Sequence, residues 1–279
     1  MHELMPKSLE IRVTQTPGRV ANKILEPVDQ LLLILPKRPK ATLWQRIPQG
    51  RKLQALMRKR PAGDVPALQT RLTNKRQTLV VAGTIATNAA AFEQLTLARK
   101  LVAAATTEKA GCLGILVAGF DGREQQVLYK AACAAALAAG FNLPHFKSKA
   151  KPAKIRSIRL VGLDEKIDLR RTLAEAKGNN LARWLTCLPP NKLDAINYAG
   201  ILKDLAQDSG WQYKRFATKE LEKLGAGAFL AVAQGNDDDS ASIVRLRYRP
   251  DTTSAPPELS LVGKGIIFDT GGTNLKPFE

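Results

Sequence analysis

Aromatic residues, cysteines and long apolar runs are all scarce in this chain of 279 residues. Phe, Trp and Tyr make up only 5% of the sequence, so Leu, Ala, Val and Ile must build most of any core. The three cysteines, Cys112, Cys133 and Cys187, lie far apart and are odd in number, which argues against a disulfide framework or a Cys-x-x-Cys metal site. We therefore expect reduced thiols, as in cytoplasmic proteins.

No apolar run reaches the roughly 20 residues that a membrane-spanning helix needs. The apolar run Leu31–Leu35 has only the length of a buried strand. Residues 1–12 contain Glu3 and Glu10 and lack the apolar segment of a secretory signal. The sequence therefore predicts a cytoplasmic protein without a membrane contact.

Acidic residues are scarce in the first part of the chain. Residues 1–160 contain 27 Lys and Arg but only 9 Asp and Glu, whereas residues 161–279 contain 16 of each kind, so the whole net charge of +18 lies in the first part. Two regions of such different charge indicate two domains with different surfaces. We expect a basic N-terminal domain over residues 1–165 and a second domain over residues 166–279.

Strand-like and helix-like segments alternate along the first region. Strand–helix alternation predicts an α/β domain with a mostly parallel sheet, in which the continuous apolar run from Cys112 to Ala118 is a strand buried on both faces. The expected strands are residues 31–35, 78–82, 112–118 and 155–161, and the expected helices are residues 51–60, 89–105 and 123–139, the last of them ending at Gly140. Residues 146–154 are basic and aperiodic, as in a surface loop.

The second region has the same alternating character. We expect helices at residues 168–185, 193–208 and 218–224, and strands at residues 211–216, 243–248 and 259–262. The helix that begins at Asp168 cannot continue through Pro189 and Pro190. The apolar run Leu259–Val262 is expected to be a buried strand that leads into a glycine-rich segment. The second region is therefore expected to be the beginning of another α/β domain.

The glycine-rich segment carries the residues with the clearest chemical potential. Lys264 stands between two glycines, Asp269 follows five residues later, and Lys276 follows seven residues after Asp269. Glycines allow tight turns and a close approach of the backbone to a ligand. The spacing alone leaves three interpretations open: a phosphate cradle, a metal site with Asp269 as an oxygen ligand and a neutral Lys264 amine as a nitrogen ligand, or a turn with two solvated lysines.

Three segments resemble the leucine aminopeptidase (cytosol aminopeptidase) family. Residues 262–277 resemble the family signature V-G-K-G-hydrophobic-x-F-D-[ST]-G-G-x-x-[IL]-K-P. Residues 180–191 resemble its A-R-x-L-x-N-x-P-P-N segment, with Cys187 in the place of the usual Asn. Residues 225–235 resemble its G-x-G-x-hydrophobic-x-A-V-x-x-G segment, in the same order and spacing. The resemblance is specific over residues 180–277, whereas residues 1–160 match only in kind, as an α/β domain.

The resemblance implies a two-metal exopeptidase site. It assigns Lys264 as a nitrogen ligand to one of two divalent metal ions, Mn²⁺ or Zn²⁺, and Asp269 as a carboxylate that bridges both. It assigns Lys276 to the substrate carbonyl, where an ammonium group stabilises the negative charge that develops during hydrolysis. Such a site binds the free α-amine of a peptide and activates a water molecule.

The rest of the family site is absent from these 279 residues. The family uses a further Asp after the position of Lys276 and then an Asp-x-Glu-x-Arg segment, and the chain contains neither. The sequence therefore predicts only the first part of a catalytic domain, without peptidase activity by itself. Other potential ligands do not replace the missing ones: Asp237, Asp238 and Asp239 read as a solvated turn, His2 and His145 are isolated, and Cys187 has no nearby histidine.

Two functions other than peptide hydrolysis stay open: DNA binding and a non-catalytic structural role. The resemblance implies peptide substrates and a homohexamer, and some bacterial members of the family also bind DNA. The basic residues of the first region allow such binding, since Lys and Arg release counterions from phosphates, although charge alone also fits a solvated surface. A non-catalytic relative kept for structure or assembly is the third hypothesis, and the retention of Lys264, Asp269 and Lys276 argues against it.

Overall fold

The computed structural model describes residues 4–6, 8–59, 65–108, 111–146, 155–235, 240–249 and 259–267. The chain forms two compact units: residues 8–183 make one, and residues 1–7 with residues 184–279 make the other. None of the helices among the described residues combines the length and apolar character needed to cross a membrane. The two units are described separately below.

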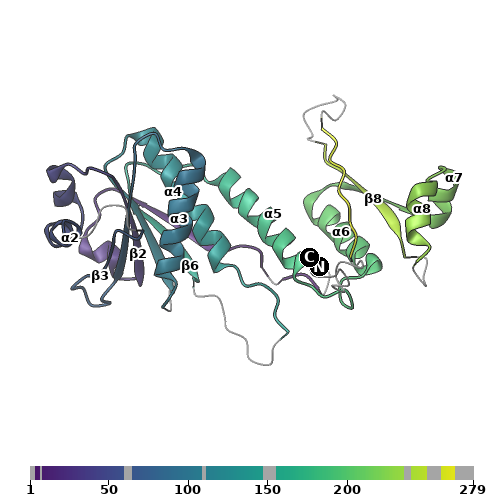
Figure 1. The fold of residues 1–279 in the computed structure, drawn as a ribbon, viewed down its shortest axis with the longest axis horizontal. Coiled ribbons are helices and arrows are strands. Elements are labelled where there is room, and N and C mark those ends of the chain that lie inside the picture. Colours follow the sequence, from purple (N-terminus) through teal and green to yellow (C-terminus); the bar gives the residue numbers. More distant parts are fainter. Residues whose placement is uncertain are drawn as a thin grey trace, which may run out of the picture. The chain divides into compact units, whose positions relative to one another are not determined.

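Unit 8–183 is built on a six-stranded sheet with the order β1-β6-β5-β2-β4-β3 (Figure 1). All neighbouring strands pair in parallel except β3 and β4, which are antiparallel at one edge. The mostly parallel sheet predicted from the alternating pattern is therefore confirmed. The strands are β1 (Arg12–Pro17), β2 (Gln30–Pro36), β3 (Leu68–Arg71), β4 (Leu79–Ile85), β5 (Cys112–Val117) and β6 (Ser157–Leu163).

Helices cover both faces of this sheet. The long helices α3 (Ala91–Ala105) and α4 (Gly122–Gly140) lie side by side on one face, and α2 (Gly50–Met57) lies on the other (Figure 1). The second face also receives the short helix α1 (Asn22–Leu25) and the 3₁₀ helix η1 (Ala41–Arg46). The predicted helices at residues 51–60, 89–105 and 123–139 correspond to α2, α3 and α4, whereas α1, η1, β1 and β3 were not predicted.

Strand β2 supplies side chains to two separate apolar clusters. Leu32 and Ile34 pack with residues of α3 and α4, while Leu31, Leu33 and Leu35 pack with Trp44, Ile47 and Leu53 on the opposite face. Each of these five β2 residues is at most 1% exposed. This arrangement explains why the sequence of β2 has no polar alternation, because both of its faces are buried.

The second unit contains a two-stranded antiparallel sheet of β7 (Gln212–Ala217) and β8 (Ser242–Arg247). Helix α6 (Ala195–Ser209) packs against both strands, and α7 (Thr218–Lys223) and α8 (Gly227–Ala233) follow β7. The helices predicted at residues 193–208 and 218–224 and the strands predicted at residues 211–216 and 243–248 are confirmed. Helix α5 (Arg170–Thr186), predicted at residues 168–185, belongs mostly to unit 8–183.

The expectation of a buried strand at Leu259–Val262 is wrong. These residues form neither helix nor strand and are exposed, with Leu261 at 87% and Val262 at 100%. A strand needs a neighbour whose backbone groups complete its hydrogen bonds, and the described β-ladder of this unit joins only β7 and β8. The basic loop expected at residues 146–154 lies outside the described residues after Phe146.

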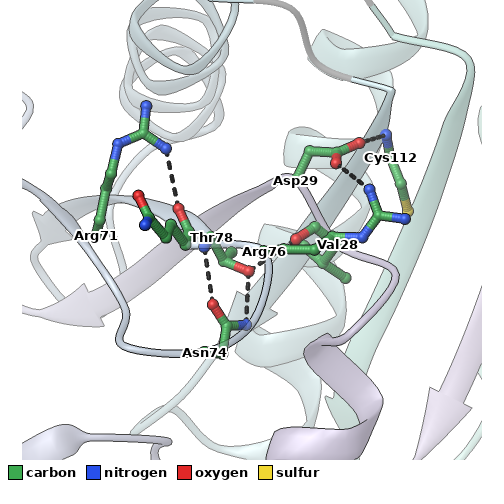
Figure 2. A network of polar contacts seen from close by, with 8 residues as sticks. Val28, Asp29, Arg71, Asn74, Arg76, Thr78 and Cys112 are labelled. Atoms are coloured by element: carbon green, nitrogen blue, oxygen red, sulfur yellow. Dashed lines mark hydrogen bonds and ion pairs between the residues drawn. The ribbon is translucent and has the colours of Figure 1, made fainter.

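A polar network closes the amino ends of β2, β4 and β5 (Figure 2). The Asp29 carboxylate accepts a hydrogen bond of 2.7 Å from the Cys112 backbone N–H and pairs with Arg76 at 2.7 Å. The buried Thr78 hydroxyl donates to the Val28 carbonyl at 2.7 Å, and the Asn74 amide bonds both the Thr78 N–H and the Thr78 hydroxyl at 2.9 Å. Because each of these groups has a partner, the network is a structural clamp rather than an open binding site.

The buried hydroxyl of Tyr129 joins α4 to the opposite, carboxyl end of the sheet. Its O–H donates to the Val161 carbonyl at 2.6 Å, next to Gly162, whose φ is +77°. Burial raises the pKa of Tyr129 well above its ordinary value of about 10. Burial also raises the pKa of the Cys133 thiol, one turn further along α4, to about 12.

The network at the amino ends of the strands predicts that substitution of Asp29 destabilises the fold more than substitution of Arg76. Asp29→Ala leaves the Cys112 N–H without its acceptor and should lower the free energy of unfolding by about 1–3 kcal/mol. Arg76→Ala removes only a largely exposed ion pair and should cost at most about 1 kcal/mol. Urea unfolding monitored by circular dichroism measures both. Equal losses in the two variants would show that the ion pair, and not the backbone bond, holds these strands.

The buried titratable groups predict a loss of stability in alkali. Both pKa values are higher in the folded chain than in the unfolded one, so their stabilising effect is complete below the unfolded pKa and falls as the pH rises toward the folded pKa. Each group should contribute a slope of about 1.4 kcal/mol per pH unit. In urea unfolding, Cys133→Ala should reduce the loss of unfolding free energy that begins near pH 9. Tyr129→Phe should reduce the loss that occurs above about pH 10. Unchanged slopes would contradict the assignment.

Candidate functional site

The three residues proposed for a metal site lie in or just after the segment that follows Leu259. The structure describes this segment through residue 267, so Lys264 is described, and Asp269 and Lys276 lie outside the described residues. Lys264 is exposed, which leaves its amine accessible to a ligand. Whether Lys264 meets Asp269 at one metal ion therefore stays a prediction.

The segment around Lys264 runs beside helix α6. A side chain added at Gly265 would lie 3.6 Å from Cε1 of Tyr198, which is an ordinary contact distance. Neither Gly263 nor Gly265 has a positive φ, and nothing lies within 4 Å of a side chain added at Gly263. The backbone conformation therefore requires glycine at neither position, and a close approach of a ligand to these glycines stays a prediction.

The segment of residues 180–191 contains the boundary between the two units. In unit 8–183, Arg183 donates a hydrogen bond of 2.8 Å to the Ala138 carbonyl at the end of α4, and the buried Asn180 donates one of 3.4 Å to the Leu9 carbonyl. In the other unit, the Trp184 indole N–H donates to the Leu4 carbonyl at 2.7 Å. These polar residues of α5 thus form structural hydrogen bonds, each within its own unit.

The segment of residues 225–235 forms a turn and a short helix. Gly225 has a φ of +70° and follows the last residues of α7, where its N–H donates to the Glu222 carbonyl at 3.0 Å. Only glycine adopts this left-handed conformation without strain, so the first glycine of the segment ends a helix. Helix α8 follows and leaves Val232 74% exposed.

The remaining candidate ligands do not form a cluster. Among the described residues, no group of three or more His, Cys, Asp and Glu side chains is placed to hold a metal ion. His145 and Cys187 are both exposed, and Cys187 is a free thiol. His2, Asp237, Asp238 and Asp239 lie outside the described residues.

A cavity that the sequence did not predict lies at the carboxyl ends of β2 and β4. It has a volume of about 240 Å³, and its walls come from the ends of these two strands, from Val65 and from the first part of α3. The signal that indicates such a place is Lys37, a charged residue that directly follows a buried strand, since α/β sheets carry their sites at this edge. The lining residues are Lys37, Val65, Thr84, Ile85, Ala86, Phe92, Glu93, Thr96, Leu97 and Lys100.

Comparison with known sequences identifies the second part of the chain. Residues 180–279 match the model of the cytosol aminopeptidase family, catalytic domain. A probable cytosol aminopeptidase of a Sulfurihydrogenibium species is 40% identical over 114 residues, which are 41% of this chain and 22% of that protein. Another from Parasynechococcus marenigrum is 34% identical over 206 residues, 73% of this chain and 42% of that protein. The chain thus spans less than half the length of these curated relatives.

Comparison with solved structures gives the same fold. A tomato leucine aminopeptidase mutant superposes with a TM-score of 0.73 at 18% identity, over 96% of this chain and 57% of that one. The bottromycin maturation enzyme BotP, solved in complex with Mn, superposes with a TM-score of 0.56 at 18% identity, over 80% of this chain and 46% of that one. At this level of identity the likeness establishes the fold and leaves the chemistry to the sequence motifs.

Proposed function

The chain belongs to the cytosol aminopeptidase family, and from this premise we propose that it is the N-terminal part, with only some of the metal ligands, of a metal-dependent aminopeptidase that removes N-terminal residues, preferably Leu-like ones, from peptides. The observation that carries the proposal is the match of residues 180–279 to the catalytic domain of that family. Lys264, Asp269 and Lys276 all fall within the matched residues and keep the spacing of the family signature. The proposal keeps residues 1–165 as a basic N-terminal domain and residues 166–279 as the first part of the catalytic domain.

The donor set fits two divalent metal ions, Mn²⁺ or Zn²⁺. The exposed amine of Lys264 offers a nitrogen donor, and Asp269 offers two carboxylate oxygens. Nitrogen and oxygen donors of this kind suit both metals, and the manganese reported for BotP supports their use in a related fold. When bound, a pair of such ions lowers the pKa of a coordinated water molecule and polarises a carbonyl group.

Each of the three residues would have a distinct role in hydrolysis. Lys264, as a neutral amine, and Asp269, as a carboxylate, would hold the metal ions. Lys276 stays protonated and donates a hydrogen bond to the carbonyl oxygen of the scissile peptide bond. Negative charge accumulates on this oxygen as water adds to the carbonyl carbon, and a fixed ammonium group stabilises it. The C–N bond then breaks, and the leaving amine takes up a proton.

The wider proposal follows the family resemblance. It includes peptide substrates, a cytoplasmic location and, for the full-length protein, assembly as a homohexamer. It also includes inactivity of residues 1–279 by themselves, because these residues contain no Asp-x-Glu-x-Arg segment to supply the further metal ligands.

We expect residues 1–279 to hydrolyse leucine p-nitroanilide no faster with Mn²⁺ or Zn²⁺ than the Lys276→Ala variant does. Activity above this control would contradict the proposal that residues 1–279 lack part of the active site. The coding DNA beyond codon 279 provides the companion test, because an in-frame Asp-x-Glu-x-Arg segment completes the proposed site.

In a protein that includes such a segment, Lys276→Ala should lower kcat by about 10²–10³-fold, the effect of losing one group that stabilises the oxyanion. Lys203→Ala, at an exposed position on α6, is the matched control and should leave kcat unchanged.

DNA binding by the basic unit is a second candidate function. One observation favours it: residues 30–92 contain a single acidic residue, Asp64, whereas Lys and Arg recur through η1, α2 and β3. Exposed cations of this segment include Lys37, Arg38, Lys40, Arg46, Arg51, Arg58, Lys59, Arg71, Lys75 and Arg76.

Binding through these cations would depend strongly on salt. A contact with 6–10 phosphates should lose about 10³–10⁵-fold in affinity for duplex DNA between about 50 and 200 mM salt. Gel-shift titrations at the two salt concentrations measure this loss. An affinity that does not change with salt, or the absence of a shift at the lower concentration, would exclude binding through phosphate contacts.

A further inference from the structure

We propose that the cavity at the carboxyl ends of β2 and β4 binds a small organic anion, with an aromatic or aliphatic body and one phosphate or carboxylate group. This inference is independent of the proposed peptidase function, because the cavity lies entirely within unit 8–183. The cavity is open to solvent, and its volume of about 240 Å³ can take up a small compound. Its place at the carboxyl edge of a parallel sheet is where loops and helices diverge and leave room for a ligand.

The floor of the cavity is apolar and rigid. Ile85, the last residue of β4, and Leu97 of α3 are each 6% exposed and belong to the same core cluster. The Ile85 carbonyl accepts a hydrogen bond of 3.0 Å from the Lys37 N–H, which fixes the end of β4 against the residue after β2. A preformed floor of this kind needs no rearrangement when a ligand enters.

An exposed aromatic side chain borders the floor. Phe92, in the first turn of α3, is 80% exposed although it is the largest apolar residue of the lining. Ligands that cover an exposed phenyl ring remove apolar surface from water, which favours binding. The rim therefore suits a ligand with an apolar body rather than a simple inorganic anion.

The charges around the cavity favour an anion. Lys37 and Lys100 come from different elements and both belong to the lining, together with the polar residues Thr84 and Thr96. The one carboxylate in the lining, Glu93, already accepts a hydrogen bond of 2.9 Å from the Ala90 N–H in the capping box of α3. Two cations against one committed carboxylate leave a positive balance for the anionic group of the ligand.

The probe is phenyl phosphate, which combines one aromatic ring with one phosphate group, and inorganic phosphate is the comparison. NMR titration of the full chain at low salt should show saturable binding of phenyl phosphate with a dissociation constant on the order of 1 mM, as expected for so small a ligand. Inorganic phosphate should bind several-fold more weakly, because it cannot cover the Phe92 ring.

Substitutions assign the binding to this cavity. Lys37→Ala and Lys100→Ala should each weaken phenyl phosphate binding by about three- to fivefold, the range for exposed charge pairs. Lys100→Arg keeps the charge and should keep the affinity. Phe92→Ala should weaken phenyl phosphate binding and leave inorganic phosphate unaffected. Lys75→Ala is the matched control, because this exposed lysine precedes β4 at the opposite edge of the same sheet.

Three outcomes would overturn the proposal. The first is the absence of saturable shifts with phenyl phosphate. The second is an equal weakening by Lys75→Ala, which would show a general effect of net charge. The third is equal binding of inorganic and phenyl phosphate with no effect of Phe92→Ala, which would show that the apolar floor takes no part. Circular dichroism spectra confirm that each variant is folded, and Lys37→Gln replaces Lys37→Ala if that variant is not.

Discussion

Burial of β2 on both of its faces is the constraint on which unit 8–183 depends. The strand places alternate side chains in two clusters, so the sheet needs cover from α3 and α4 on one face and from α2, η1 and α1 on the other. A parallel sheet with only one covered face would expose half of these leucines to water. The connections between strands must therefore pass over both faces, and this requirement places the helices.

The amino ends and the carboxyl ends of the strands differ in how their polar groups are satisfied. At the amino ends of the strands, Asp29, Thr78 and Asn74 supply partners for backbone groups of neighbouring strands, and this edge is closed. At the carboxyl ends, the Tyr129 hydroxyl serves the end of β6, while the ends of β2 and β4 border a cavity. The polar network thus lies at the amino ends of β2, β4 and β5, and the surface available for a ligand lies at the carboxyl ends of β2 and β4.

The function of the second unit is inferred from its sequence motifs more than from its described structure. Its described part is a two-stranded sheet with three helices, a shape that many proteins share. The match to the cytosol aminopeptidase family covers residues 180–279, which include Lys264, Asp269 and Lys276 at the spacing of the family signature. In the described part of this segment Lys264 is exposed, and Gly265 lies beside Tyr198 of α6.

The sequence by itself determined the elements with strong patterns: the apolar strands β2, β4 and β5, the helices α2, α3 and α4, the parallel character of the sheet, and the family motifs. These follow from local periodicity, which a single sequence displays. Only the tertiary structure decided the strand order and the role of Asp29, because both depend on residues far apart in the chain. It also revealed the short edge strand β3, whose sequence Leu-Gln-Thr-Arg has no apolar strand pattern. Long-range pairing also explains the failure at Leu259–Val262, whose apolar pattern fits a strand but finds no described partner. The cavity lined by Lys37 and Lys100 is likewise a product of packing, since the two lysines are 63 positions apart in the sequence.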